Sequence, residues 1–135
     1  MIGTGYVGLV SGVCFSDLGN TVYCVDKDKD KIDLLNNGTV PIYEPGLEEI
    51  LKRNSKQKRL IFTSDLKKAV SKSDIIFICV GTPTKKNSNS ADLKNVFKVV
   101  HELKKIIPEN NNAALRLGAR KNVQGTGLED HPAWR

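Results

Sequence analysis

Three glycines near the start of the chain have the spacing GxGxxG, in the run Gly3-Thr4-Gly5-Tyr6-Val7-Gly8. In such a loop the first glycine makes a tight turn, the second lets a pyrophosphate approach the backbone, and the third lets a helix pack closely on a strand. An apolar stretch with helical spacing follows the loop. The free N–H groups and partial positive charge at the start of that helix favour phosphate. The loop therefore predicts a dinucleotide site.

The loop does not fit a nucleoside triphosphate. Gly3 and Gly8 also match the GxxxxG part of a P-loop, but Leu9 and Val10 stand where Lys and Ser or Thr are required. The chain then lacks the side chains that would hold the γ-phosphate and Mg²⁺. A P-loop that binds a nucleoside triphosphate is therefore excluded.

Asp26 is the acid that a dinucleotide loop requires further along the chain. It lies eighteen residues after Gly8, directly after the predicted strand 21–25. A carboxylate there accepts hydrogen bonds from the adenosine ribose. Because it also repels a 2′-phosphate, the cofactor is predicted to be NAD rather than NADP.

Helices and strands alternate through the first 107 residues. The patterns predict strands at residues 21–25, 60–62 and 75–80, and helices at residues 7–18, 27–36, 46–53, 64–70 and 90–107. Ser64 and Ser90 are the expected N-caps of the last two helices. In the first helix, the apolar stripe Val7, Val10, Cys14 and Leu18 is expected to face inward. The fold class is α/β: a Rossmann-type parallel sheet with flanking helices.

The first strand of this sheet is expected to be largely missing, because only Met1 and Ile2 precede Gly3. In the strand order 3-2-1-4 this strand lies at the centre of the sheet. Four or five absent core side chains at about 2 kcal/mol each forfeit about 10 kcal/mol, and a whole domain is stable by only about 5–15 kcal/mol. We therefore expect a marginal or partly molten chain that binds NAD weakly if at all.

A change in composition near residue 110 divides the chain. Lysine dominates before it, whereas the tail carries three of the five arginines, the only Trp and the run Asn110-Asn111-Asn112 without apolar periodicity. We expect a partial NAD-binding Rossmann domain over residues 1–109 and a divergent, irregular C-terminal tail over residues 110–135. A native surface tail of unusual composition is the alternative.

Composition excludes several other classes. The 135 residues are 39% hydrophobic and 27% charged with a formal net charge of +6, which is typical of a globular domain. The longest apolar run, residues 75–80, is too short to cross a bilayer, so no membrane partner is expected. Three cysteines without a CxxC pair or His cluster predict no disulfide and no metal site, and a cytoplasmic location. The basic cluster at residues 52–59 lacks interleaved aromatics, so no nucleic-acid partner is expected.

Five longer stretches resemble the N-terminal part of the UDP-glucose/GDP-mannose dehydrogenase family. They are GTGYVGLVSG (3–12), CVDKDKDKI (24–32), PIYEPGLEEIL (41–51), SDIIFICVGTPT (73–84) and SADLKNVF (90–97). The tyrosine of PIYEPGL and the Ala-Asp-Leu of the last stretch favour the UDP-glucose branch. The resemblance implies oxidation of UDP-glucose to UDP-glucuronate with two NAD⁺, by an enzyme that is a homo-oligomer at full length.

The resemblance also implies residue roles. Tyr6 and Val7 would join Gly3, Gly5 and Gly8 around the pyrophosphate, Asp26 and Lys31 would hold the adenosine ribose, and Thr82 would contact the cofactor near its reactive half. The family's nucleophilic cysteine, catalytic lysine and sugar-nucleotide pocket have no counterpart in these 135 residues, so no catalytic residue is expected and the fragment itself should be inactive. GDP-mannose or a UDP-acetylaminohexose as substrate, and a non-catalytic NAD-binding or inert fragment, remain the alternatives.

Overall fold

Strands and helices alternate along the computed structural model, which describes residues 1–85, 90–107 and 114–117. The elements are α1 (Tyr6–Asp17), β1 (Val22–Val25), α2 (Lys29–Asn36), α3 (Leu47–Lys56), β2 (Leu60–Thr63), α4 (Leu66–Ser71), β3 (Ile75–Ile78), α5 (Lys94–Ile106) and β4 (Ala114–Leu117). The predicted α/β class is confirmed. No helix in these ranges is long and apolar enough to cross a membrane.

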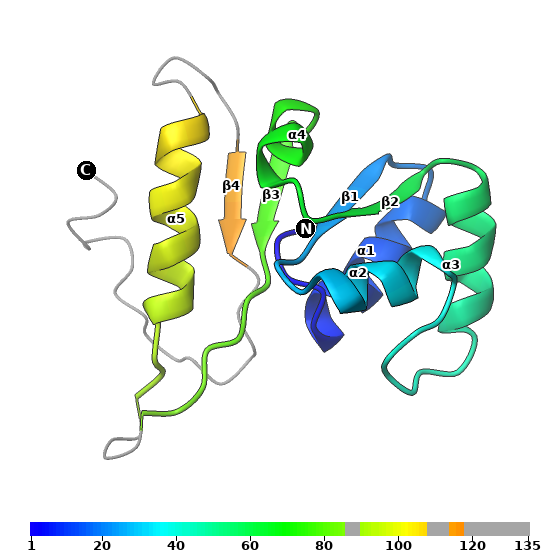
Figure 1. Cartoon of the computed structure of the whole chain (residues 1–135), viewed down its shortest axis with the longest axis horizontal. Helices are drawn as coiled ribbons and strands as arrows, with labels where there is room; N and C mark the ends of the chain where they lie inside the picture. Colours follow the sequence, from blue (N-terminus) through cyan, green and yellow to red (C-terminus); the bar gives the residue numbers. More distant parts are fainter. Residues whose placement is uncertain (86–89, 108–113, 118–135) are drawn as a thin grey trace.

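The named strands of the described residues pair in parallel, as the Rossmann-type prediction requires. β1 pairs with β2 in the register Val22 opposite Leu60, and β3 pairs with β4 in the register Ile75 opposite Ala114. Residues 1–3 join the two pairs, because Ile2 forms a parallel bridge to β1 on one side and to β3 on the other. The order is therefore β2, β1, residues 1–3, β3, β4, and Figure 1 shows the N-terminus between β1 and β3. Residues 1–3 thus occupy the central position of the sheet.

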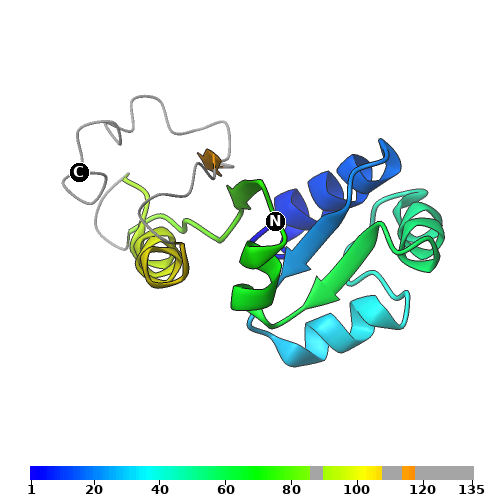
Figure 2. The ribbon, with the colours of Figure 1, turned by 90° about the horizontal axis from the view of Figure 1, so that it is seen from above.

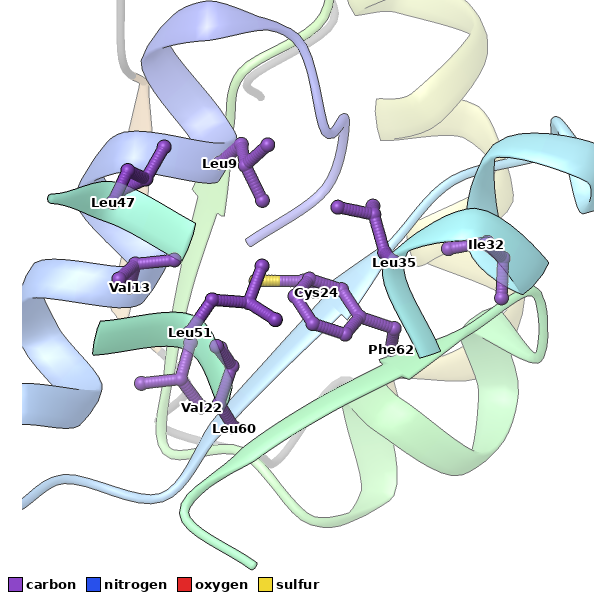
Figure 3. Close-up of a cluster of buried hydrophobic side chains, with 10 residues drawn as sticks. All are labelled: Leu9, Val13, Val22, Cys24, Ile32, Leu35, Leu47, Leu51, Leu60 and Phe62. Carbon is purple, nitrogen blue, oxygen red and sulfur yellow. The ribbon is translucent and has the colours of Figure 1, made fainter. Parts of the chain in front are cut away.

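Two hydrophobic clusters hold the elements together. The larger one gathers side chains from α1, α2 and α3 over β1 and β2, and Figure 3 shows them pointing toward one another: Leu9, Val13, Val22, Cys24, Ile32, Leu35, Leu47, Leu51, Leu60 and Phe62. The smaller one packs α5 against β3 and Ile2: Ile2, Ile76, Ile78, Val96, Val100 and Leu103. Figures 1 and 2 show α5 on the far side of the N-terminus from α1, α2 and α3. The chain therefore has two half-cores that meet at residues 1–3.

The predicted inward stripe of α1 is wrong. Cys14 is exposed and Leu18 is 78% exposed, whereas Gly8, Gly12 and Val13 are buried. A Cβ atom on Gly12 would lie 2.5 Å from Cys24 Sγ of β1. The helix therefore turns its glycine-bearing face to the sheet, because only that face can come so close.

The predicted helix caps differ from the observed ones. α4 begins after Asp65, whose side chain accepts a hydrogen bond from Lys68 N (2.9 Å), so Ser64 is not the cap. Ser90 likewise lies ahead of α5, whose cap position is Leu93. An aspartate carboxylate is as good a cap as a serine hydroxyl, so sequence alone did not separate neighbouring candidates.

β4 corrects the expectation of an irregular tail from residue 110 onward. Ala114–Leu117 forms a strand parallel to β3, because this short, largely apolar segment pairs with the edge that β3 leaves open. The remainder of the predicted tail lies outside the described residues.

Candidate dinucleotide-binding site

The glycine loop is folded tightly between the end of β3 and the start of α1. Gly3 has φ +100°, and a Cβ there would lie 2.7 Å from Cys79 O; a Cβ on Gly8 would lie 1.9 Å from Gly3 O. Gly5 is different, because a Cβ on it would meet nothing within 4 Å. Two of the glycines thus permit close packing, and the third leaves open space above the backbone.

That open space lies at the N-terminus of α1. Gly5 is the N-cap residue, in an extended conformation, and its carbonyl accepts the first helical bond from Leu9 N (2.9 Å). The N–H groups of the first turn have no partner inside the helix. Together with the helix dipole they form an arrangement that binds phosphate.

Asp26 lies at the mouth of this loop, at the end of β1. Its Oδ2 accepts hydrogen bonds from Thr4 N (2.9 Å), Thr4 Oγ1 (2.6 Å) and Lys31 Nζ (3.1 Å). Its Oδ1 accepts only one longer bond, from Asp28 N (3.2 Å). Oδ1 therefore carries fewer donors than Oδ2, and its remaining lone pair can accept a hydrogen bond from a ligand hydroxyl.

The surroundings keep Asp26 ionised. Partial burial acts to raise its pKa, but the hydrogen bonds from Thr4, Asp28 N and Lys31 outweigh it and lower the pKa to about 2. The Asp26 side chain is 13% exposed, and the Lys31 ammonium beside it is 29% exposed. At neutral pH Asp26 therefore presents an ionised carboxylate beside the glycine loop.

A cavity of about 400 Å³ opens over the loop. Its floor is formed by Gly3, Gly5 and Cys79, and Asp26 and Lys31 line its side. The opposite wall belongs to the turn after β3 and to α5: Val80, Gly81, Asn95, Lys98, Val99 and Glu102. The cavity thus lies at the carboxyl ends of β1 and β3, where parallel α/β sheets bind their ligands.

The structure brings some of the predicted site residues together and leaves others apart. Gly3, Gly5, Asp26 and Lys31 line the cavity, and Gly8 packs directly beneath Gly3. The remaining three lie outside the cavity lining: Tyr6 and Val7 in the first turn of α1 with exposed side chains, and Thr82 half-buried after β3. The Tyr6 hydroxyl donates a short hydrogen bond to Glu44, which raises the pKa of Tyr6. Their contacts with a cofactor stay predictions.

Sequence reasoning missed Thr4 and the α5 wall. Thr4 is 1% exposed, and two of its groups donate to Asp26. A hydroxyl residue between the first two glycines of the motif is a usable signal for such a contact. The α5 residues gave no local signal, because their place beside the loop depends on how β3 and α5 pack.

Glycine loop, carboxylate and cavity at the ends of parallel strands together define a dinucleotide-binding domain of the Rossmann type. Residues 1–115 match the UDP-glucose/GDP-mannose dehydrogenase family, NAD binding domain, and the chain belongs to this family. NAD is the cofactor that this domain binds.

The relatives that the chain matches are named for different substrates. The chain is 53% identical over 103 residues to a UDP-glucose 6-dehydrogenase of Rhizobium meliloti. The aligned residues make up 76% of this chain and 24% of that protein. It is 48% identical over 103 residues to a GDP-mannose 6-dehydrogenase of Pseudomonas aeruginosa, covering 76% and 23%. A solved GDP-mannose dehydrogenase from Pseudomonas aeruginosa superimposes with a TM-score of 0.79 at 44% identity, covering 87% of this chain and 28% of that one. The chain spans about a quarter of the length of the curated relatives it matches.

In the part of the chain that the structure describes, no group of three or more His, Cys, Asp or Glu side chains is arranged to hold a metal ion. The three cysteines are free thiols: Cys14 is exposed, Cys24 is buried and Cys79 is half-buried. The site described above offers the backbone amides of the glycine loop and the Asp26 carboxylate with its donors, and α5 adds Lys98 and Glu102 to the wall of the cavity.

Proposed function

We propose that this chain is the NAD-binding part of an enzyme that oxidises UDP-glucose to UDP-glucuronate with two molecules of NAD⁺. The observation that carries the proposal is the position of Asp26 beside the glycine loop, fixed there by Thr4 and Lys31. The bound NAD would supply hydride acceptance. The chain's own residues would hold the pyrophosphate at the first turn of α1 and a ribose hydroxyl at Asp26 Oδ1.

Tyr6, Val7 and Thr82 complete the proposed contacts. Backbone N–H groups of Tyr6 and Val7 belong to the first turn of α1, so they serve the pyrophosphate even though their side chains point outward. Thr82 directly follows Gly81, a cavity residue, at the carboxyl end of β3. That position suits a contact farther along the dinucleotide, toward its reactive half.

The similarity to the relatives favours UDP-glucose over GDP-mannose as the proposed substrate. The Rhizobium meliloti UDP-glucose 6-dehydrogenase is more similar to this chain than the Pseudomonas aeruginosa GDP-mannose 6-dehydrogenase, at 53% against 48% identity over 103 residues each. Tyr43, which is exposed in the 41–51 stretch, is the tyrosine by which the chain resembles the UDP-glucose branch of the family. The free thiols suit a reducing cytoplasm, where we place the enzyme.

NAD⁺ titration of the chain, followed by amide shifts in a ¹H–¹⁵N spectrum, tests the cofactor site. We expect saturable shifts at residues 3–8 and at Asp26, because these residues form the loop and the carboxylate beside it. NADP⁺ is the matched control and should shift these amides far less. Equal responses to both cofactors would refute the role of Asp26.

Activity is tested separately. The 135-residue chain mixed with UDP-glucose and NAD⁺ should form no detectable NADH. The protein expressed from a longer coding sequence of the same source should form NADH with UDP-glucose. It should form little NADH with GDP-mannose or a UDP-acetylaminohexose. NADH formation by the short chain would contradict the assignment of the catalytic residues to another part of the enzyme.

A further inference from the structure

Thr4, between the first two glycines of the loop, is a buried polar residue whose hydroxyl bonds to the site carboxylate. Only 1% of Thr4 is exposed, so its hydroxyl is shielded from water and needs a partner within the protein. That partner is Asp26, whose Oδ2 accepts from the Thr4 hydroxyl at 2.6 Å and from the Thr4 backbone N–H at 2.9 Å. One loop residue therefore binds one oxygen of the carboxylate through two donors.

These two donors make the oxygens of Asp26 unequal. Lys31 Nζ (3.1 Å) joins them on Oδ2, whereas Oδ1 accepts one longer bond from Asp28 N (3.2 Å). Because three donors already crowd Oδ2, a ligand hydroxyl finds its free lone pair on Oδ1. The last torsion of an aspartate side chain is soft and nearly two-fold. The donors around the carboxylate therefore decide which of its oxygens is left for a ligand.

The Thr4 hydroxyl is the donor best suited to hold this orientation. It makes the shortest of the four hydrogen bonds to Asp26 described above, and a bond to an ionised acceptor is about twice as strong as a neutral one. The β-branched side chain of Thr4 is stiff about χ1, whereas the flexible Lys31 side chain is 29% exposed. Burial is the largest single influence on the pKa of Asp26 and raises it, but the Thr4 hydroxyl is the largest of the influences that lower it to about 2.

The rest of the cavity gives this orientation a consequence for the choice of cofactor. Lys27, Lys31 and Lys98 line the cavity together with Asp26, and Glu102 of α5 is a second carboxylate in the lining. The lysines attract the phosphates of NAD and of NADP alike, so they do not distinguish the two. Discrimination against a 2′-phosphate depends on a carboxylate that stays in place to bind the ribose. A carboxylate free to turn would pair with the lysines instead.

We propose that Thr4 is a positioning residue that sets the choice of cofactor: its hydroxyl holds Asp26 so that Oδ1 accepts a ribose hydroxyl and a 2′-phosphate is excluded. The proposal rests on the proposed function, because NAD must bind at this site for the carboxylate to select it. It goes beyond that function by assigning the selectivity to a buried hydroxyl that acts through the carboxylate. Loss of the hydroxyl should therefore change the ratio of the two cofactor affinities.

Thr4→Val and Thr4→Ser separate the hydroxyl from the rest of the side chain. Valine has the shape of threonine without the hydroxyl, and serine keeps the hydroxyl without the methyl group. In amide-shift titrations Thr4→Val should raise the Kd for NAD⁺ about tenfold without raising that for NADP⁺, because it loses a hydrogen bond to a charged group. Thr4→Ser should keep the selectivity of the parent. Thr4→Ala, which lacks the hydroxyl and adds no bulk, should behave like Thr4→Val.

Two further measurements isolate the route through Asp26. In a ¹³C titration of the side-chain carboxyl, Thr4→Val should raise the pKa of Asp26 from about 2 toward its ordinary value, and Thr4→Ser should not. In the Asp26→Asn background, Thr4→Val should no longer change the ratio of the two Kd values.

The outcomes separate this proposal from the function on which it rests. A parent chain whose amides do not respond to NAD⁺ would refute the proposed function, and this proposal with it. With a responding parent, an unchanged ratio of Kd values in Thr4→Val and Thr4→Ala would overturn the role of Thr4 alone. Equal weakening of both cofactors would do the same, because a merely structural residue has that effect. So would a Thr4→Val effect on the ratio that persists in Asp26→Asn.

Discussion

Replacing Gly8 by Ala should destabilise the fold, because this glycine is where α1 touches the loop backbone. The added Cβ would lie 1.9 Å from Gly3 O, and the backbone there is fixed by the hydrogen bonds from Gly3 N to Val25 O (2.7 Å) and from Cys79 N to Ile2 O (2.7 Å). Alanine gains up to about 1 kcal/mol over glycine in a helix, but overpacking against fixed backbone costs about 1–3 kcal/mol or more. With a shift of more than 1 Å required, we take the upper end of that range and expect a net loss of about 2 kcal/mol in the free energy of unfolding.

Gly5→Ala is the matched control within the same loop. Gly5 already has φ −69°, and a Cβ there meets nothing within 4 Å. Alanine is the poorer N-cap residue, but it also restricts the unfolded chain, so the two effects nearly cancel. This variant should fold like the parent and yet lose the NAD⁺-induced amide shifts, because its methyl group occupies the space above the loop.

Urea unfolding followed by circular dichroism measures both variants, with NAD⁺ titration on the same samples. The midpoint should fall for Gly8→Ala at an unchanged slope and stay near that of the parent for Gly5→Ala. The reasoning is refuted if Gly8→Ala is as stable as the parent, or if Gly5→Ala binds NAD⁺ as the parent does.

Three further changes probe contacts around the site. Asp26→Asn should lower the free energy of unfolding by about 2 kcal/mol at pH 7. Since the folded pKa of Asp26 is lowered to about 2, this difference should be full above the ordinary carboxyl pKa and vanish as the pH falls toward 2 in acid-dependent urea titrations. Gly12→Ala and Cys24→Ala should each lower the free energy of unfolding by about 1–2 kcal/mol. The double variant should lose less than the sum of the two, because the new methyl group fills the space that Sγ left. Strict additivity in the double-mutant cycle would contradict this. Glu44→Ala should lower the pKa of Tyr6 toward its ordinary value in an ultraviolet titration read against Tyr6→Phe, while the urea midpoint stays unchanged because both side chains are exposed.

Features of the fold that depend on neighbouring residues were predictable from the sequence. The β-branched run before Asp26 became β1, and the apolar run after Asp74 became β3, each beginning or ending within two residues of the expected place. The glycine loop and its acid also lie together as the motif predicts. These features are set by local conformation and by the register of a parallel sheet.

Features that depend on packing were not predictable. The buried face of α1 was misjudged because hydrophobicity marks Val7 and Val10, whereas the sheet selects the face on which Gly8 and Gly12 permit approach. β4 was missed because Ala114–Leu117 is short and has no clean period, and it becomes a strand only where the free edge of β3 accepts it. In both cases the deciding partner is distant in sequence.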